Sequence, residues 1–207
     1  AKPEKCVFAR SSMQYLGHRI DKDGLHMTDD HIKAITNAPP PTDVSTLKSF
    51  LGMVTFYLKF VPKSAEILQP LYALLKKDQK WIWSEKCNRS FDRIKKILTS
   101  RPVLTHFDAD KPLKLVVDAS SKAVGAVLAH TTDKGDQPIA YASQLLTQTQ
   151  QSYPSIEREA YAIIFGISKF KDFLYGRKFD LVTDHRPLIY IFGSKKGLPI
   201  YAANRVQ

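Results

Sequence analysis

The sequence predicts a mixed α/β fold that is α+β overall: a small hairpin set and a helical bundle, followed by a mixed sheet flanked by helices. Three observations predict it. Short apolar runs separated by turn residues fill the first thirty residues, which is typical of antiparallel hairpins. Apolar residues then recur at helical spacing to about residue 98. From residue 107 strand-like runs take over, interrupted by one long amphipathic stretch.

The composition indicates a globular protein with a basic surface. Of 207 residues 43% are hydrophobic, and 31 Lys and Arg against 20 Asp and Glu give a formal charge of +11. This excess favours a polyanionic partner such as nucleic acid, and a charge that serves solubility alone is the alternative. No apolar run approaches the roughly 20 residues of a membrane helix, so we expect no membrane partner. Cys6 and Cys87 lack metal-ligand spacing and indicate a reducing compartment.

The hairpin set is expected from three apolar runs, KCVFA, MQYLGHRI and LHM. Asp23-Gly24 favours a tight turn before the last run, and Gly17 relieves the strand in which it lies. Because this set is too small to fold alone, we expect the chain to begin inside a domain whose larger part lies upstream.

Three helices are expected next. The first has Asp43 or Ser45 as its N-cap and ends near Val61, before Pro62. Its buried stripe follows the helical spacing and consists of Leu47, Phe50, Leu51, Val54, Tyr57, Leu58 and Val61. The second helix is interrupted or started at Pro70 and carries Ile67, Leu68, Leu71, Leu74 and Leu75. The third runs from Ser84 to Leu98.

The second half predicts strands over residues 113–120, 123–130 and 138–146, then a helix over 155–174, a strand over 179–183 and a short helix after Pro187. Because the first three strands follow each other directly, this order differs from a repeating βαβ unit. Side chains alternate along a strand. Leu113, Leu115 and Val117 should therefore face one side of the first strand, and Lys114, Val116 and Asp118 the other.

Three acidic residues occupy corresponding places in these elements. Asp118 and Asp184 each end a strand, and Glu159 lies on the helix between them. Glu157 and Glu159 flank the apolar stripe of that helix on opposite sides, so the helical pattern does not choose between them. The small Gly166 on the Glu159 side mildly favours close approach there.

Carboxylates in this order suit a metal-dependent nuclease. Their oxygens are the ligands that Mg²⁺ or Mn²⁺ prefers, and two such ions can act together on a phosphodiester. Taken singly, Asp118 and Asp184 are more typical of residues that start turns after strands, and Glu159 of a solvated helix residue. The joint acidic pattern on this order of elements favours the metal site.

Six motifs are distributed along nearly the whole chain: YLGHRI, LKSFLGMVTFYLKFVP, WSEKCNRSFDRIKKILTSRPVL, LVVDASSKAVGAVL, PIAYAS and EREAYAIIFGISKFKDFLYGRKFDLVTDHRPL. Together they resemble the pol polyprotein of gypsy-type LTR retrotransposons. The resemblance implies that residues 1–105 form the end of the reverse transcriptase palm and the thumb and connection helices, and that residues 106–207 form a ribonuclease H-like domain. It also implies that Asp118, Glu159 and Asp184 bind two ions, with the EAYAI motif selecting Glu159 over Glu157.

The chain departs from the family pattern in two ways. The family's paired polymerase aspartates, in its Y-x-D-D motif, have no counterpart here, so we expect no polymerase active site. The family's ribonuclease H continues to another strand and a fourth acid, whereas this chain stops at ANRVQ. We therefore expect an incomplete ribonuclease H-like domain, truncated at its C-terminal end.

A nucleic-acid face is expected on the first long helix, on the side away from its apolar stripe. It consists of Lys48, Gly52, Thr55, Phe56 and Lys59, in which an aromatic and a glycine lie between cations that can meet phosphates. The alternative is that Gly52 lets two helices pack closely, Phe56 widens the stripe and the lysines are solvated. The resemblance adds a primer-grip-like segment, Tyr15, Leu16, Gly17 and His18, and His185 is a candidate phosphate contact.

The leading hypothesis is a retroelement enzyme fragment that binds RNA/DNA hybrid and duplex nucleic acid and hydrolyses the RNA strand. Its partners would be the rest of the pol polyprotein, namely the upstream fingers and palm and the downstream end of the ribonuclease H and the integrase. We expect it in the cytoplasm, in virus-like particles, or in the nucleus. The alternative is a truncated or domesticated module that binds nucleic acid or protein without cleavage. An integrase-like transferase is disfavoured, because that family places its glutamate last.

Overall fold

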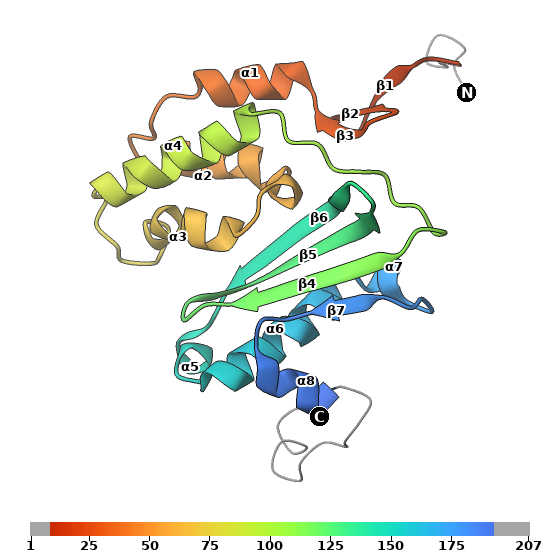
Figure 1. The fold of residues 1–207 in the computed structure, drawn as a ribbon. Helices are drawn as coiled ribbons and strands as arrows, with labels where there is room; N and C mark the ends of the chain where they lie inside the picture. The colour runs from red at the N-terminus through yellow and green to blue at the C-terminus, as the bar shows by residue number, and fades with distance from the viewer. Residues whose placement is uncertain (1–8, 193–207) are drawn as a thin grey trace. The chain divides into compact units, whose positions relative to one another are not determined.

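The structure is a computed structural model that describes residues 9–192, as helices and strands in two compact units (Figure 1). The first unit consists of Ala1–Val61 and Ile67–Ala109, and the second of Pro62–Glu66 and Asp110–Gln207. The domain boundary between residues 105 and 106 stays a prediction. The predicted α+β class is confirmed. No described helix has both the length and the apolar character that a membrane span requires.

The first unit begins with a three-stranded antiparallel sheet in the order β1-β2-β3. Its strands are β1 (Ser12–Tyr15), β2 (His18–Asp21) and β3 (Gly24–Met27). The run MQYLGHRI is two strands and not one, because Leu16 and Gly17 have φ angles of 45° and 75° and form a tight turn. The predicted run at residues 5–8, with Cys6, lies outside the described residues.

At Gly24 the backbone of this sheet lies against the backbone of Leu104, near the C-terminal end of the first unit. Its φ is +143°, and a Cβ there would lie 2.2 Å from the carbonyl oxygen of Leu104. Leu25 exchanges backbone hydrogen bonds with Leu104, at 2.8 and 3.1 Å. Only glycine fits so close to another backbone. Gly24 therefore serves the turn before β3 and also allows the hydrogen bonds between Leu25 and Leu104 to form.

The helices of the first unit enclose an apolar core. They are α1 (Asp29–Asn37), α2 (Val44–Thr55), the 3₁₀ helix η2 (Leu58–Phe60), α3 (Ser64–Ala73), whose first residues belong to the second unit, and α4 (Glu85–Thr99). Asp43 begins α2 with a capping box, because its side chain accepts from the backbone of Thr46 and the Thr46 hydroxyl accepts in return. The buried side chains include Ile35, Leu47, Phe50, Leu51, Val54, Tyr57, Leu71, Phe91, Ile94 and Leu98.

Three features of these helices differ from the sequence prediction. The helix α1 was not expected, although Thr28 precedes two acidic residues of its first turn. The first long helix ends at Thr55 and not near Val61, because the chain tightens into η2. Pro70 lies inside α3, which starts earlier than expected.

The second unit is a four-stranded mixed sheet in the order β6-β5-β4-β7, with α6 packed across β4 and β5 (Figure 1). Its strands are β4 (Leu113–Ala119), β5 (Ala123–Thr132), β6 (Gly135–Leu145) and β7 (Asp180–Val182). The first three are antiparallel, and β7 runs parallel to β4. Its helices are α5 (Gln148–Gln151), α6 (Ser155–Lys169), α7 (Lys171–Leu174) and α8 (Arg186–Phe192).

The core of the second unit lies between α6 and the sheet. Leu113, Leu115 and Val117 of β4 are buried, while Lys114, Val116 and Asp118 are partly exposed, so the predicted alternation is confirmed. The helix predicted to reach Leu174 is broken at Phe170 into α6 and α7. The short α5 was not expected.

Candidate metal centre and nucleic-acid face

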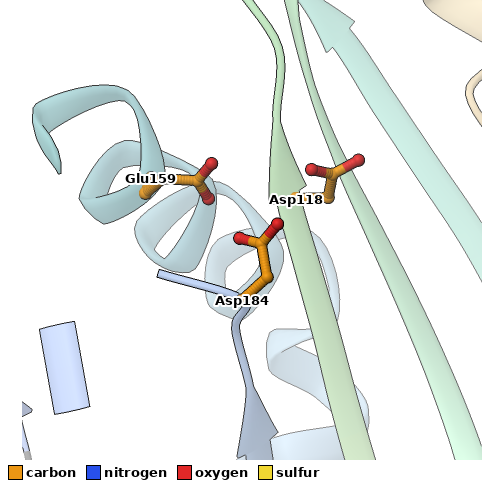
Figure 2. Close-up of side chains that lie close together, drawn as sticks. All are labelled: Asp118, Glu159 and Asp184. Atoms are coloured by element: carbon orange, nitrogen blue, oxygen red, sulfur yellow. The ribbon is translucent and has the colours of Figure 1, made fainter. Parts of the chain in front are cut away.

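Three carboxylates from distant parts of the chain meet at one end of the sheet (Figure 2). Asp118 lies near the end of β4, Asp184 follows β7, and Glu159 lies in α6. One oxygen of each lies within 4.8 Å of the others. The structure therefore brings together the three acids named from the sequence.

The strand register explains why two of these acids meet. Val116 of β4 is paired with Val182 of the parallel strand β7, and parallel partners advance along the sheet at the same rate. Asp118 and Asp184 each come two residues later. They therefore lie side by side at the same end of the sheet.

Glu159 reaches these aspartates from the helix that covers the sheet. Its residue is 5% exposed, and its Oε2 atom has no hydrogen-bond partner within the part of the chain that the structure describes. Burial, followed by the negative charges of Asp184 and Asp118, raises the pKa of Glu159 to about 7. Glu159 is therefore not the solvated helix residue of the alternative interpretation, and its charged form requires a nearby cation. Glu157 does not belong to the acidic group.

Lys63 also contacts this group and was not named from the sequence. Its Nζ atom donates to Asp118 Oδ2 at 2.6 Å. The hydroxyl of Ser120, two residues after Asp118, donates to the carboxylate of Glu66. No local pattern could have found Lys63, because it lies in the short segment 62–66 and meets Asp118 only in the folded chain.

His185 follows Asp184 and is partly buried. Its backbone N–H donates to the hydroxyl of Thr183 at 3.2 Å. The structure thus places His185 next to the acidic group in the chain, and a phosphate contact through its ring stays a prediction.

The predicted primer-grip-like segment lies against the end of α2 within the first unit. The imidazole of His18 stacks on Phe56, with ring centroids 4.8 Å apart and planes at 12°. The hydroxyl of Tyr57 donates to the carbonyl oxygen of Gly17 at 2.8 Å. Tyr15, Leu16 and Phe56 remain exposed, Leu16 to 72% and Phe56 to 51%. An exposed apolar surface therefore joins two segments that are distant in the sequence.

His18 is itself buried beneath this surface. Its Nδ1 atom has no hydrogen-bond partner among residues 9–192. Burial and the neighbouring charge of Lys59 lower the pKa of His18 to about 4. The ring is therefore neutral at physiological pH and serves as a stacking partner for Phe56.

The remaining residues of the predicted face lie on the outer side of α2 and just after it. Lys48, Gly52 and Thr55 are exposed, and a Cβ at Gly52 would meet no atom within 4 Å. Gly52 therefore does not serve close packing of two helices, which removes one part of the alternative interpretation. Lys59 lies 6.0 Å from the centroid of the Phe56 ring, and burial lowers the pKa of this lysine.

One protein-family model matches the chain from α4 to β7. Residues 83–181 match the model of an RNase H-like domain found in reverse transcriptase. The matched range includes Asp118 and Glu159 and ends before Asp184.

Curated relatives are retrotransposon polyproteins. The retrovirus-related Pol polyprotein from transposon opus of Drosophila melanogaster is 36% identical over 204 residues, which are 93% of this chain and 20% of that polyprotein. The transposon Tf2-3 polyprotein of Schizosaccharomyces pombe is 36% identical over 189 residues, 89% of this chain and 14% of the relative. The chain thus spans a fifth or less of the length of these relatives.

Solved structures share the fold. The foamy viral protease-reverse transcriptase in complex with RNA/DNA hybrid superposes with a TM-score of 0.77 at 24% identity, over 98% of this chain and 28% of the other. The same enzyme in complex with dsDNA gives a TM-score of 0.77 over 44% of that chain. The chain is related to retrotransposon Pol polyproteins, and its residues 83–181 belong to the family of RNase H-like domains found in reverse transcriptase.

Proposed function

We propose that the chain is the ribonuclease H part, with preceding thumb helices, of a gypsy-type LTR retrotransposon Pol polyprotein, and that it hydrolyses the RNA strand of RNA/DNA hybrids. The observation that carries this proposal is the meeting of Asp118, Glu159 and Asp184 within 4.8 Å. The relation to an RNase H-like reverse transcriptase domain supports the same reaction class. A foamy viral relative in fold was solved with RNA/DNA hybrid, which supports this substrate.

The three acids fit a pair of Mg²⁺ or Mn²⁺ ions. All donors are carboxylate oxygens, which suit hard divalent cations. Glu159 Oε2 is buried without a partner among the described residues, as expected for an atom whose partner is an ion. A bound pair of such ions supplies Lewis acidity toward the phosphodiester.

The residues of this chain have separate roles in the proposed reaction. The paired strands β4 and β7 hold Asp118 and Asp184 at a fixed spacing. The helix α6 presents Glu159 from the buried side, so solvent reaches the acids mainly from the side of the aspartates. Rigid placement of this kind lowers the cost of reorganisation during the reaction.

The first unit would hold the nucleic acid. Lys48 and Lys59 supply positive charge for phosphates, while exposed Leu16 and Phe56 supply apolar surface for sugars. Such contacts depend on the backbone and not on base sequence. This fits an enzyme that must act at many positions of a hybrid.

The proposal is tested with a hybrid whose RNA strand is labelled. Incubation of the whole chain with the hybrid and Mg²⁺ should produce RNA cuts and leave the DNA strand intact. Asp118→Asn should remove the cuts, whereas Asp136→Asn should not, because Asp136 pairs with Lys114 near the other end of β4. Cuts that persist in Asp118→Asn would remove the assigned site.

A second candidate is a module that binds hybrid without cleaving it. One observation favours it, namely the ammonium group of Lys63 on Asp118, since an ammonium held there permanently would keep a divalent ion away. Tight hybrid binding without turnover at millimolar Mn²⁺ would identify this function.

A further inference from the structure

The ammonium group of Lys63 binds one carboxylate oxygen of Asp118, an acid of the candidate ion site. The Nζ atom is 2.6 Å from Asp118 Oδ2, and the positive charge is also stabilised by Glu66 and Asp184. Hydrogen bonding and charge attraction from Asp118 raise the pKa of Lys63 further, so the side chain is an ammonium at all physiological pH values. A cation is therefore already present at the edge of the acidic group.

The backbone around Lys63 is fixed to the same end of the sheet. The hydroxyl of Ser64 is 2.9 Å from the Ser143 hydroxyl, and the N–H of Ala65 donates to that same Ser143 oxygen at 2.8 Å. The Glu66 carboxylate accepts from Ser120. Three successive residues thus anchor the segment to β6 and to the residue after β4.

The conformation of Lys63 itself is one that L residues disfavour. Its φ is 52°, in the left-handed region, which a residue with a Cβ adopts only when its surroundings hold it there. The anchored residues 64–66 provide this restraint. The side chain consequently starts from a fixed point beside Asp118, and 62% of it remains exposed.

We propose that Lys63 is an internal competitor for the divalent cation, so that its ammonium group must leave Asp118 before an ion is fully coordinated. This inference rests on the proposed function, because it takes the acids to be an ion site. The ammonium group occupies lone pairs on one of the two Asp118 oxygens, and its positive charge repels any ion that this carboxylate holds. Lys63 therefore lowers the affinity of the site for its ion.

A second ion pair provides the matched control. Lys114 Nζ lies 2.7 Å from Asp136 Oδ1, so its geometry resembles that of Lys63 with Asp118. Lys114 is four residues from Asp118 along β4, about 13 Å at the rise of an extended strand. At that separation the removal of one charge is largely screened at physiological salt.

The test is a Mn²⁺ titration of the whole chain by isothermal calorimetry, without nucleic acid. Lys63→Met should bind Mn²⁺ about threefold to tenfold more tightly than the unsubstituted chain. Lys114→Met should bind as the unsubstituted chain does, and Lys63→Arg, which keeps the charge, should restore the weaker binding. Asp118→Asn should abolish the heat of Mn²⁺ binding. This result would assign that heat to the site formed by the three acids. Thermal unfolding followed by circular dichroism verifies that each variant is folded, and the rise in melting temperature with added Mn²⁺ should be largest for Lys63→Met.

The outcomes separate this inference from the proposed function. Equal or weaker Mn²⁺ binding by Lys63→Met overturns the competition, even if the chain cleaves hybrid. Tighter binding by Lys63→Met together with no RNA cleavage supports the competition and overturns the nuclease function. If no variant shows a heat of Mn²⁺ binding that depends on Asp118, the competition and the nuclease function are both overturned. Removal of the Lys63 ammonium group would then not have opened an ion site.

Discussion

Gly166 of α6 lies against Val117 of β4, so closely that a Cβ at residue 166 would be 3.0 Å from Val117 Cγ1. It would also lie 3.2 Å from the Cβ of Ala126. This contact lets the helix approach the sheet, and the same helix carries Glu159 while the same strand carries Asp118. The absent side chain at residue 166 is therefore part of what brings the two carboxylates together.

Replacement of Gly166 by Leu should lower the free energy of unfolding of the second unit by about 1–3 kcal/mol, because the added atoms overpack the interface. It should also weaken Mn²⁺ binding, since α6 must move away from β4. Gly52→Ala is the control, because a Cβ there meets open space. This second change should stabilise the first unit by about 0.5–1 kcal/mol through helix propensity. Urea unfolding measures the free energy of unfolding of both variants. A Gly166→Leu variant as stable as the unsubstituted chain would contradict the close packing of α6 on β4.

The stability of the ion-free second unit should fall as pH rises. The pKa of Glu159 is raised from 4.5 to about 7 in the folded protein, so its neutral form stabilises the fold fully below pH 4.5. This contribution is lost as pH rises through about 7, and amounts to on the order of 3 kcal/mol. Glu159→Gln should lack this part of the pH dependence. Urea unfolding in EDTA between pH 4.5 and 8 measures it, and equal slopes for the two proteins would contradict it.

His18 should make the first unit sensitive to acid. Burial lowers the pKa of His18 from 6.5 to about 4. The contribution of its neutral imidazole to the free energy of unfolding is therefore present above pH 6.5 and is lost as pH falls toward 4. The loss between pH 7 and pH 5 should be on the order of 2 kcal/mol. His18→Phe can still stack on Phe56 but cannot be protonated, and its stability should change less with pH. Urea unfolding at the two pH values, followed in the first unit, provides the comparison. A variant as acid-sensitive as the original would show that the buried imidazole is not the cause.

The lysines of the predicted nucleic-acid face should contribute to binding through phosphates. Lys48→Gln and Lys59→Gln should each reduce the slope of log affinity against log salt by about one for an RNA/DNA hybrid. Lys134→Gln, in the exposed turn between β5 and β6, should leave the slope unchanged. Fluorescence anisotropy at several salt concentrations measures all three slopes. Slopes that do not differ from that of the unsubstituted chain would remove Lys48 and Lys59 from the interface.

The acidic group could be predicted from the sequence because its determinants are local. Asp118 lies near the end of one apolar strand and Asp184 follows another, and the parallel register of β4 and β7 then brings them to one end of the sheet. The helical pattern alone left Glu157 and Glu159 open. Burial in the folded protein separates them, since only Glu159 faces the aspartates. In the sequence, the small size of Gly166 on the Glu159 side and the EAYAI motif of the family resemblance favoured Glu159.

Other features depend on tertiary contacts and could not be predicted in this way. Lys63 meets Asp118 through a segment anchored by Ser143, which is far away in the sequence. The turn at Leu16 and Gly17 interrupts an apolar run that is typical of one strand, and Tyr57 and Phe56 hold this turn in place. The nine-residue α1 is short and has only Ile35 fully buried, so few apolar residues mark it in the sequence.

The most direct test is a crystal of the chain soaked in MnCl₂ and measured at an X-ray wavelength where manganese scatters anomalously. The convergence of Asp118, Glu159 and Asp184 predicts an anomalous peak among these carboxylates, within coordination distance of their oxygens. The same crystal of Asp118→Asn should lose the peak or show it weakened. A map with manganese at other surface acids and none among these three would contradict the metal site, and with it the proposed hydrolysis.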